Sequence, residues 1–233
     1  MVLSTQTSCE EPRPSLPRHR TTPRPGGRLL GGLVVALLGL APATGLAGSE
    51  ATIPDLYASS YSHEHRGSFD LAVNEMLQVL RIAPQDYVAC LRAGWLNYQA
   101  GRFDDAVVHY RKAVQVAPRA VEARLGLLLP LMANLRWKEA EAVAREVLVT
   151  DPGNYLARSR LAWTLYSLGR FKEAETLYTA LVEGYPGDFE MRLGLGWTLL
   201  KQGRKAEARP HFETVLRVDA HNLRARAGME EAR

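Results

Sequence analysis

One fixed spacing, the interval from Gly67 to Gly101, repeats through most of this 233-residue chain and limits the folds that it can adopt. In most periods a glycine is followed after two residues by an aromatic residue and after five by an alanine, and four periods close on a proline. The residues in these registers are Gly67, Gly101, Gly169 and Gly203; Phe69, Phe103, Trp137 and Phe171; Ala72, Ala106, Ala140, Ala174 and Ala208; and Pro84, Pro118, Pro152 and Pro186. Because no insertion interrupts the spacing, we expect each period to form one structural unit that stacks on the next.

Each of these residue types has a physical role in a unit made of two helices. Glycine adopts the backbone conformation that ends one helix, as at Gly101, and proline ends the second helix before the turn to the next unit. Alanine lets the paired helices approach closely, and the neighbouring aromatic ring fills the space between them. The apolar residues between the markers follow helical spacing, and no segment alternates like a half-buried strand. The sequence therefore predicts an all-α fold.

A longer pattern joins these markers. It consists of Gly94, Gly101-Arg102-Phe103-Asp104-Asp105-Ala106, Tyr110, Ala113 and Pro118, and Gly169-Arg170-Phe171-Lys172-Glu173-Ala174 with Tyr178 and Pro186 repeats it. This pattern resembles the tetratricopeptide repeat (TPR) family. The resemblance implies a right-handed superhelix of antiparallel helical hairpins, with five tandem units over residues 53–222 and a short capping helix over residues 223–233. The units start at Ile53, Tyr87, Val121, Tyr155 and Phe189. Because the family serves many roles, the pattern predicts the fold far more specifically than the function.

Two units depart from the pattern. The third has Leu135 where the glycine belongs and Pro130 inside its first helix, which removes a backbone hydrogen bond, so we expect a kink and local irregularity there. The fifth has Lys205 in the aromatic position, Pro210 inside its second helix and Ala220 where proline closes the other units. We expect this terminal unit to be the least stable.

Residues 1–47 have the order of a secretory signal peptide. A basic, proline-rich stretch precedes the apolar run over residues 29–40, and the small residues around Ala43 and Ala47 suit a signal peptidase, with cleavage preferred after Ala47. Residues 48–52 then form a linker. The alternative is an uncleaved anchor in the inner membrane over residues 29–49, which is just long enough to span a bilayer. Both interpretations place the repeats outside the cytoplasm, in the periplasm or cell envelope.

Most of the net charge of +4 belongs to this leader, because residues 1–47 carry a net charge of +3 and the remaining residues only +1. A nearly neutral body with mixed signs lacks the basic surface that nucleic acid binding requires, so we expect no nucleic acid partner. Cys90 is the only cysteine after the leader, which predicts no internal disulfide. We interpret Cys90 as a small buried apolar side chain.

Aromatic residues recur on the first helix of the predicted hairpins, which the family resemblance places on the concave side of the superhelix. Tyrosine or tryptophan occupies one register in four of the five units, and leucine fills this register in the third. Apolar residues three or four positions away extend the stripe, and an arginine precedes two of the tryptophans by one helical turn. The predicted partner-binding groove consists of Tyr57, Tyr61, Leu91, Arg92, Trp95, Tyr98, Leu129, Met132, Arg160, Trp163, Tyr166, Trp197 and Leu200.

The alternative interpretation of this stripe is that it packs adjacent repeats together. A second apolar stripe is available for that role, and it consists of Ala93, Gly94, Leu127, Leu128, Leu131, Leu161, Leu165, Leu195 and Leu199. Two stripes need two surfaces to cover them, which favours an open groove for the first. A suitable partner is an extended or helical protein segment with apolar anchors and with acidic groups for the arginines.

No arrangement of residues in the sequence indicates an enzyme, a cofactor or a metal site. In His63-Glu64-His65 the two histidines point about 200° apart on a helix and cannot hold one ion together. The sequence contains no phosphate-binding loop, nucleophile elbow or pair of catalytic carboxylates in a supporting strand context. Acidic residues follow four of the arginines by three positions, as Glu173 follows Arg170, and we interpret them as ion pairs at helix starts.

The predicted function is therefore that of a non-enzymatic scaffold or adaptor for protein–protein interaction in the cell envelope. A partner segment would lie in the aromatic groove. The alternative is a carrier for a lipid or polysaccharide ligand, which would use the same groove during envelope assembly or export. The N-terminal segment would associate the protein with a membrane if it is not cleaved.

Overall fold

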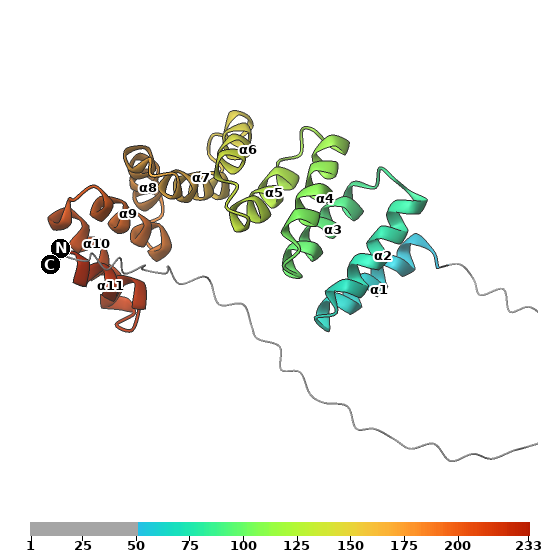
Figure 1. Cartoon of the computed structure of the whole chain (residues 1–233), viewed down its shortest axis with the longest axis horizontal. Helices are drawn as coiled ribbons and strands as arrows, with labels where there is room; N and C mark the ends of the chain where they lie inside the picture. Colours follow the sequence, from blue (N-terminus) through green and yellow to red (C-terminus); the bar gives the residue numbers. More distant parts are fainter. Residues whose placement is uncertain (1–50) are drawn as a thin grey trace, which may run out of the picture. The chain divides into compact units, whose positions relative to one another are not determined.

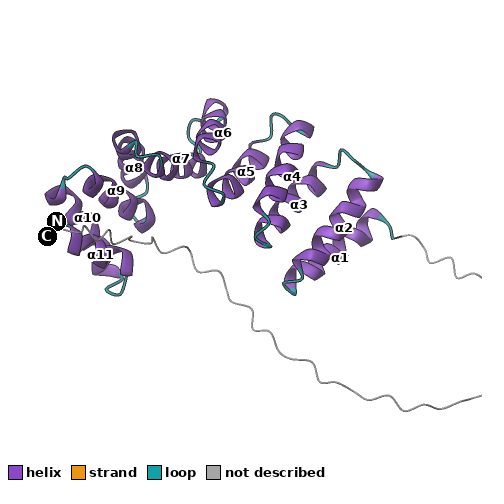
Figure 2. Ribbon diagram, viewed as in Figure 1, coloured by secondary structure: helices purple, strands orange, loops and turns teal. Residues whose placement is uncertain are grey.

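The computed structural model describes residues 51–233, which fold into eleven α-helices without a β-strand (Figure 1, Figure 2). The helices are α1 (Ile53–His65), α2 (Phe69–Ile82), α3 (Tyr87–Gln99), α4 (Phe103–Val116), α5 (Val121–Ala133), α6 (Trp137–Thr150), α7 (Tyr155–Ser167), α8 (Phe171–Gly184), α9 (Phe189–Lys201), α10 (Lys205–Val218) and α11 (Leu223–Glu231). The predicted all-α fold of antiparallel helical hairpins is confirmed. The expected signal peptide or anchor, at residues 1–47, lies outside the described residues.

Helices α1 to α10 pair into five hairpins, and α11 packs against α9 and α10. In each hairpin the first helix ends in a turn that requires a positive φ. Gly101 has φ of +75° and donates its N–H to the carbonyl of Tyr98 (3.0 Å), while Arg102 donates to the carbonyl of Asn97 (2.8 Å). This pair of bonds satisfies the last carbonyls of α3 in a Schellman arrangement. The glycine register of the sequence therefore marks the turn inside each hairpin.

Leu135 adopts φ of 55° at the turn where the other hairpins have glycine. This left-handed conformation crowds Cβ against a carbonyl oxygen at a cost of roughly 1–2 kcal/mol, while the side chain is 68% exposed and contributes little packing. We expect Leu135→Gly to raise the free energy of unfolding by about 1 kcal/mol, because glycine avoids the strain. Urea denaturation followed by circular dichroism measures the change. The reverse variant, Gly169→Leu, should lower the stability, and unchanged midpoints in both variants would contradict the strain at Leu135.

Neither internal proline ends its helix, since α5 continues through Pro130 and α10 through Pro210. Both ends of α5 in the third hairpin also depart from the pattern of the other first helices. Leu135 follows its C-terminus with the strained φ, and Ala120 precedes its N-terminus without a side chain that can cap it. The other first helices all begin after an Asp, Asn or Thr whose side chain accepts a backbone N–H.

Arginines in the first turn of α5, α7, α9 and α11 connect each of these helices to the hairpin before it. Arg124 Nη1 donates to the carbonyl of Pro118 (2.7 Å), and Arg158, Arg192 and Arg226 each donate to the carbonyl six residues earlier. These carbonyls belong to the turn that follows a second helix, where backbone acceptors lack helical partners. The bonds therefore fix the turn between successive hairpins, which the sequence did not reveal.

The core lies between the first and second helices and continues from one hairpin to the next. The five alanines of the repeat register are all 0% exposed, which confirms close helix approach at these positions. The second apolar stripe is buried as predicted, and so is Cys90, whose thiol pKa is raised by burial. Within residues 51–233 no helix combines the length and the apolar character needed to cross a bilayer.

Candidate partner-binding face

The predicted groove residues lie on the first helices of the five hairpins. Successive first helices contact one another from α3 with α5 to α9 with α11, so their outward side chains form a surface shared between hairpins. We call the surface formed by the thirteen predicted groove residues the first-helix face. Its most exposed aromatic side chains are Tyr61, 46% exposed, and Trp163, 38% exposed.

The aromatic register serves both the core and the surface. Trp95, Leu129 and Trp197 are half-buried, and the Trp197 ring meets the buried Phe212 ring edge-on, with 5.6 Å between centroids. These residues are therefore neither wholly part of the core nor wholly exposed in a groove. The part of the register that is open to a partner is concentrated at Tyr61 and Trp163.

Two of the predicted groove residues are largely buried. Leu200 is only 7% exposed and belongs to the core. Arg92 is 9% exposed, and its Nη2 donates to Ser60 Oγ and to Glu64 Oε2, both at 3.0 Å. The guanidinium also lies 3.5 Å from the centroid of the Tyr61 ring. Arg92 therefore joins α3 to α1, and its guanidinium is occupied within the chain rather than free to bind an acidic partner as expected.

Arg160 occupies the same register as Arg92 but has different partners. Its Nη1 donates to the backbone carbonyl of Leu125 in α5, and the ionisable side chains that act on it are those of Tyr98 and Tyr110. Burial lowers the pKa of this guanidinium. Among the described residues no carboxylate lies within ion-pair distance of Arg160. It is a partly buried cation with only neutral acceptors.

Two chains of aromatic rings repeat along the face. In the first, Tyr98 lies 6.0 Å from Trp95 and 5.7 Å from Phe103 between ring centroids. In the second, Tyr166 stacks on Trp163 with centroids 5.4 Å apart and planes 13° apart, and it meets Phe171 edge-on at 5.5 Å. Each chain connects the face to the turn inside its hairpin, so the tryptophan rings are held in place by packing.

A cavity of about 290 Å³ opens on this face between α3 and α5. Leu91, Arg92 and Trp95 line it from α3, Glu122 and Gly126 from α5, and Tyr110 from α4. The wall is formed mainly by apolar atoms of the leucine and the aromatic rings. The cavity therefore suits an apolar side chain of a partner, and three of the residues that line it are among those predicted from the sequence.

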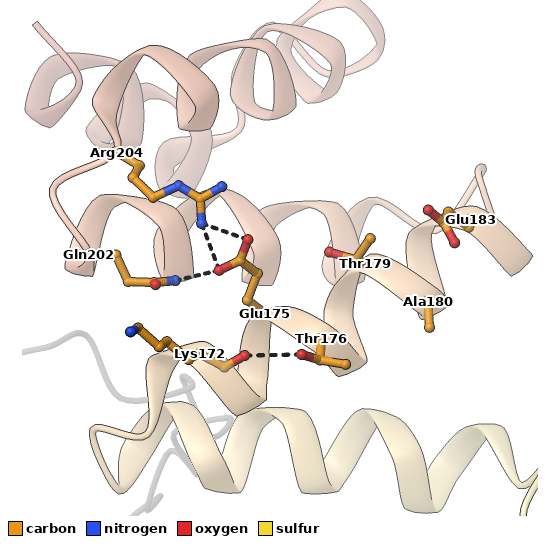
Figure 3. Close-up of a pocket in the computed structure, with 8 residues that line it drawn as sticks. All are labelled: Lys172, Glu175, Thr176, Thr179, Ala180, Glu183, Gln202 and Arg204. Atoms are coloured by element: carbon orange, nitrogen blue, oxygen red, sulfur yellow. Dashed lines mark hydrogen bonds and ion pairs between the residues drawn. The ribbon is translucent and has the colours of Figure 1, made fainter.

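A larger cavity, of about 590 Å³, lies along α8 and reaches the turn after α9 (Figure 3). At one end Glu175 accepts from Arg204 Nη1 (2.6 Å) and from Gln202 Nε2 (2.8 Å), so its charge is matched within the chain (Figure 3). The rest of the lining includes Thr176, Thr179 and Ala180 but no aromatic or large aliphatic side chain. It is therefore a weaker candidate for binding than the cavity between α3 and α5.

The arginine–acid pairs predicted at helix starts form in three of four hairpins. Glu139, Glu173 and Glu207 pair with the arginine three residues before them, whereas Arg102 pairs with Asp70 of the preceding hairpin. Three of these arginines also reach an acid of the preceding hairpin, which links the repeats. Among residues 51–233 no group of His, Cys, Asp or Glu side chains is arranged to hold a metal ion.

Several residues of the site were not identified from the sequence. Tyr110 is only a repeat marker there, and no sequence pattern singles out Gly126 or Glu122, although together the three form one side of the cavity. Glu64 was considered only as part of a histidine cluster, but it accepts hydrogen bonds from both Arg92 Nη2 (3.0 Å) and Trp95 Nε1 (2.9 Å). A spacing of about one repeat between Glu64 and these partners was the available signal.

Tandem helical hairpins with a partly open aromatic face define a repeat protein of the solenoid class, whose members typically act in protein–protein interaction and are usually not catalytic. The family model for the tetratricopeptide repeat matches residues 91–155 and 159–222, more than half of the 233 residues. The chain belongs to the tetratricopeptide repeat family. No curated protein sequence matches the chain.

Solved structures of similar fold include the MamA fragment 41-end from Desulfovibrio magneticus RS-1, with 18% identity and a TM-score of 0.68 over 73% of this chain and 97% of that one. YrrB, described as a TPR protein with an unusual peptide-binding site, has 14% identity and a TM-score of 0.67 over 78% and 94%. The thermophilic TPR protein TTC0263 of Thermus thermophilus has 18% identity and a TM-score of 0.57 over 78% and 98%. At these identities the likeness shows the fold.

Proposed function

We propose that this protein is a non-enzymatic scaffold that binds a polypeptide segment along the first-helix face of α3, α5 and α7. The observation that supports the proposal is the 290 Å³ cavity lined by Leu91, Trp95 and Tyr110. An open apolar cavity beside exposed aromatic rings is the arrangement that receives the anchor residues of a partner. YrrB, of similar fold, is described as having a peptide-binding site, which supports the same class of ligand here.

The cavity persists because α5 has no side chain at the point where it faces Tyr110. A Cβ atom on Gly126 would lie 2.2 Å from Tyr110 Cε1, so glycine is needed for the ring to lie against α5. The ring is 3% exposed and forms part of the cavity wall. Rigid walls of this kind favour binding, because little side-chain entropy is lost when a partner enters.

We also propose that the protein acts in the periplasm or cell envelope, which rests on the order of charged, apolar and small residues at positions 1–47. The test is expression in a bacterial host followed by fractionation and intact mass analysis. A periplasmic protein that begins after Ala47 supports cleavage, and a full-length protein in the membrane fraction supports the anchor over residues 29–49. A full-length protein in the cytoplasm would contradict both.

Trp163→Ala tests the binding function. The side chain is 38% exposed, so we expect its loss to weaken partner binding by about 2 kcal/mol, or roughly thirtyfold in Kd, while the melting temperature changes little. Crosslinking in the native organism identifies the partner, and titration of a synthetic peptide from it measures Kd. A control is Tyr185→Ala, which removes a similarly exposed ring after α8, outside the first-helix face.

The outcomes separate the alternatives. If Trp163→Ala unfolds the protein, the ring is a core residue and the face is not a free surface. If a lipid or glycan co-purifies in stoichiometric amount and is lost in Trp163→Ala, the protein is a carrier rather than a scaffold. If Trp163→Ala and Tyr185→Ala bind the peptide equally well, the partner lies elsewhere on the molecule.

A further inference from the structure

A second period, twice as long as the hairpin repeat, underlies the first four hairpins. Helices α5 to α8 repeat α1 to α4 at this doubled spacing, and the two stretches that match the family model, which start at positions 91 and 159, are offset by the same interval. The pairs of identical residues are Tyr87 and Tyr155, Arg92 and Arg160, Trp95 and Trp163, Tyr98 and Tyr166, Phe103 and Phe171, and Tyr110 and Tyr178. We call α1 to α4 the first module and α5 to α8 the second module.

In the first module a carboxylate connects the arginine to the tryptophan. Glu64 of α1 accepts from Arg92 Nη2 through Oε2 (3.0 Å) and from Trp95 Nε1 through Oε1 (2.9 Å). One acidic side chain thereby neutralises a buried guanidinium and satisfies an indole N–H. This network belongs to the chain itself, so the first module has no free cation on the face.

In the second module the carboxylate is missing. Met132 of α5 occupies the position that corresponds to Glu64, one doubled period later in the sequence. The Arg160 guanidinium donates to the Leu125 carbonyl instead, and within residues 51–233 Trp163 Nε1 has no hydrogen-bond partner. Trp163 is also the more exposed of the two tryptophans, at 38%. The second module keeps the two donors of the first module without the acceptor that joins them.

We propose that an acidic side chain of the bound polypeptide supplies this carboxylate, accepting from Arg160 and from Trp163 Nε1 as Glu64 does in the first module. The inference rests on the proposed function of the first-helix face. It adds the chemistry of the ligand. An apolar residue of the ligand occupies the cavity between α3 and α5, and an aspartate or glutamate next to it binds Arg160 and Trp163 of α7. The bound segment crosses α5, which lies between the two sites.

The electrostatics of the face support a negative rather than a neutral group. A partly buried cation that has only neutral acceptors is costly, and a carboxylate brought next to it removes that cost. The stacked Trp163 and Tyr166 rings place apolar surface next to the proposed carboxylate, and a charge interaction with Arg160 is stronger in such surroundings than in water. Met132, half-buried, presents no charge that would repel the ligand.

The experiment uses a library of displayed random peptides selected on the full chain, with synthetic, C-terminally amidated copies of the enriched peptides measured by fluorescence anisotropy. We expect the enriched peptides to carry Asp or Glu at a constant separation from an apolar residue. Replacing that Asp or Glu by Asn or Gln should weaken binding to the natural chain by about tenfold or more, and Arg160→Gln should remove the preference for the acidic form.

Met132→Glu is the matched variant, because it rebuilds the network of the first module in the second. We expect Met132→Glu to weaken the binding of acidic peptides by about tenfold or more, because Arg160 then has a carboxylate partner within the chain. For the same reason we expect it to raise the melting temperature. Met132→Gln has nearly the same size without the charge, and it should leave the acidic preference intact. If Arg160→Gln does not fold, the comparison of Met132→Glu with Met132→Gln still tests whether Arg160 binds an acidic residue of the peptide.

Three results would overturn the inference. If peptides whose binding depends on Trp163 bind equally well with and without an acidic residue, the proposed function holds but the carboxylate site is wrong. Peptides that bind only with a free C-terminal carboxylate would assign Arg160 to a chain end instead of a side chain. If no selected peptide is sensitive to Trp163→Ala, both the inference and the proposed function fail.

Discussion

Gly126→Ala is expected to lower the free energy of unfolding by about 2 kcal/mol, because the added methyl group overpacks a close helix contact. Its Cβ would lie 2.2 Å from Cε1 and 2.7 Å from Cζ of Tyr110, a ring that is only 3% exposed. Alanine alone would favour the helix by roughly 1 kcal/mol over glycine. A net loss therefore means that the clash exceeds this gain. Urea denaturation followed by circular dichroism measures the difference.

The control for Gly126→Ala is Gly184→Ala in α8. A Cβ on Gly184 would meet no atom within 4 Å, so this variant should be neutral or slightly more stable. A second variant, Gly126→Ala combined with Tyr110→Ala, removes the clash. Its free energy of unfolding should fall by less than the sum of the decreases in the two single variants. If Gly126→Ala is as stable as the natural chain, the close packing of Tyr110 on α5 is not what holds the cavity wall in place.

Glu64→Met is expected to destabilise the protein by about 2 kcal/mol, because it leaves the Arg92 guanidinium buried without its carboxylate. Arg92 is 9% exposed, and Ser60 Oγ and the Tyr61 ring are its remaining partners. The expected loss lies below that of a fully buried pair because the Glu64 side chain is 23% exposed. Methionine is the residue that the second module has at the corresponding position, Met132.

The control for Glu64→Met is the same substitution at Glu190, which pairs with Arg224 while 64% of its side chain is exposed. We expect Glu190→Met to change the free energy of unfolding by less than about 1 kcal/mol. The double variant Glu64→Met with Arg92→Met should recover part of the loss, since no unpaired charge then remains. If Glu64→Met and Glu190→Met lower the free energy of unfolding equally, Arg92 has found another hydrogen-bond acceptor in place of Glu64.

The sequence predicted the hairpins well because their determinants are local. A glycine that ends a helix, a proline after the second helix and alanines at the helix contact act within a few residues of their own positions. The exception at Leu135 was also visible as a break in the glycine register, although only the φ of 55° shows that leucine accepts the same turn. Pro130 does not interrupt α5, because one missing hydrogen bond is tolerated inside a packed helix, and the kink expected there stays a prediction.

The candidate site was predicted less completely, because its interactions join residues from different hairpins. The sequence placed Arg92 and Arg160 in one register and assigned both to the rim of a groove. The structure separates them: Arg92 is held by Glu64 (3.0 Å), whereas within residues 51–233 the hydrogen bond of Arg160 goes to a backbone carbonyl. Equal spacing makes two residues equivalent in a repeat, but the neighbour across the helix contact decides the environment of each.

The sequence by itself determined the repeat length, the helices, the buried stripe and the register that carries the aromatic residues, because helical periodicity records which side of a helix meets its neighbour. The tertiary structure decided which members of that register are open, where Gly126 leaves room for Tyr110, and that Glu64 serves Arg92 and Trp95. These features depend on the distances between side chains of helices that belong to different hairpins. Such distances are set only when the hairpins pack.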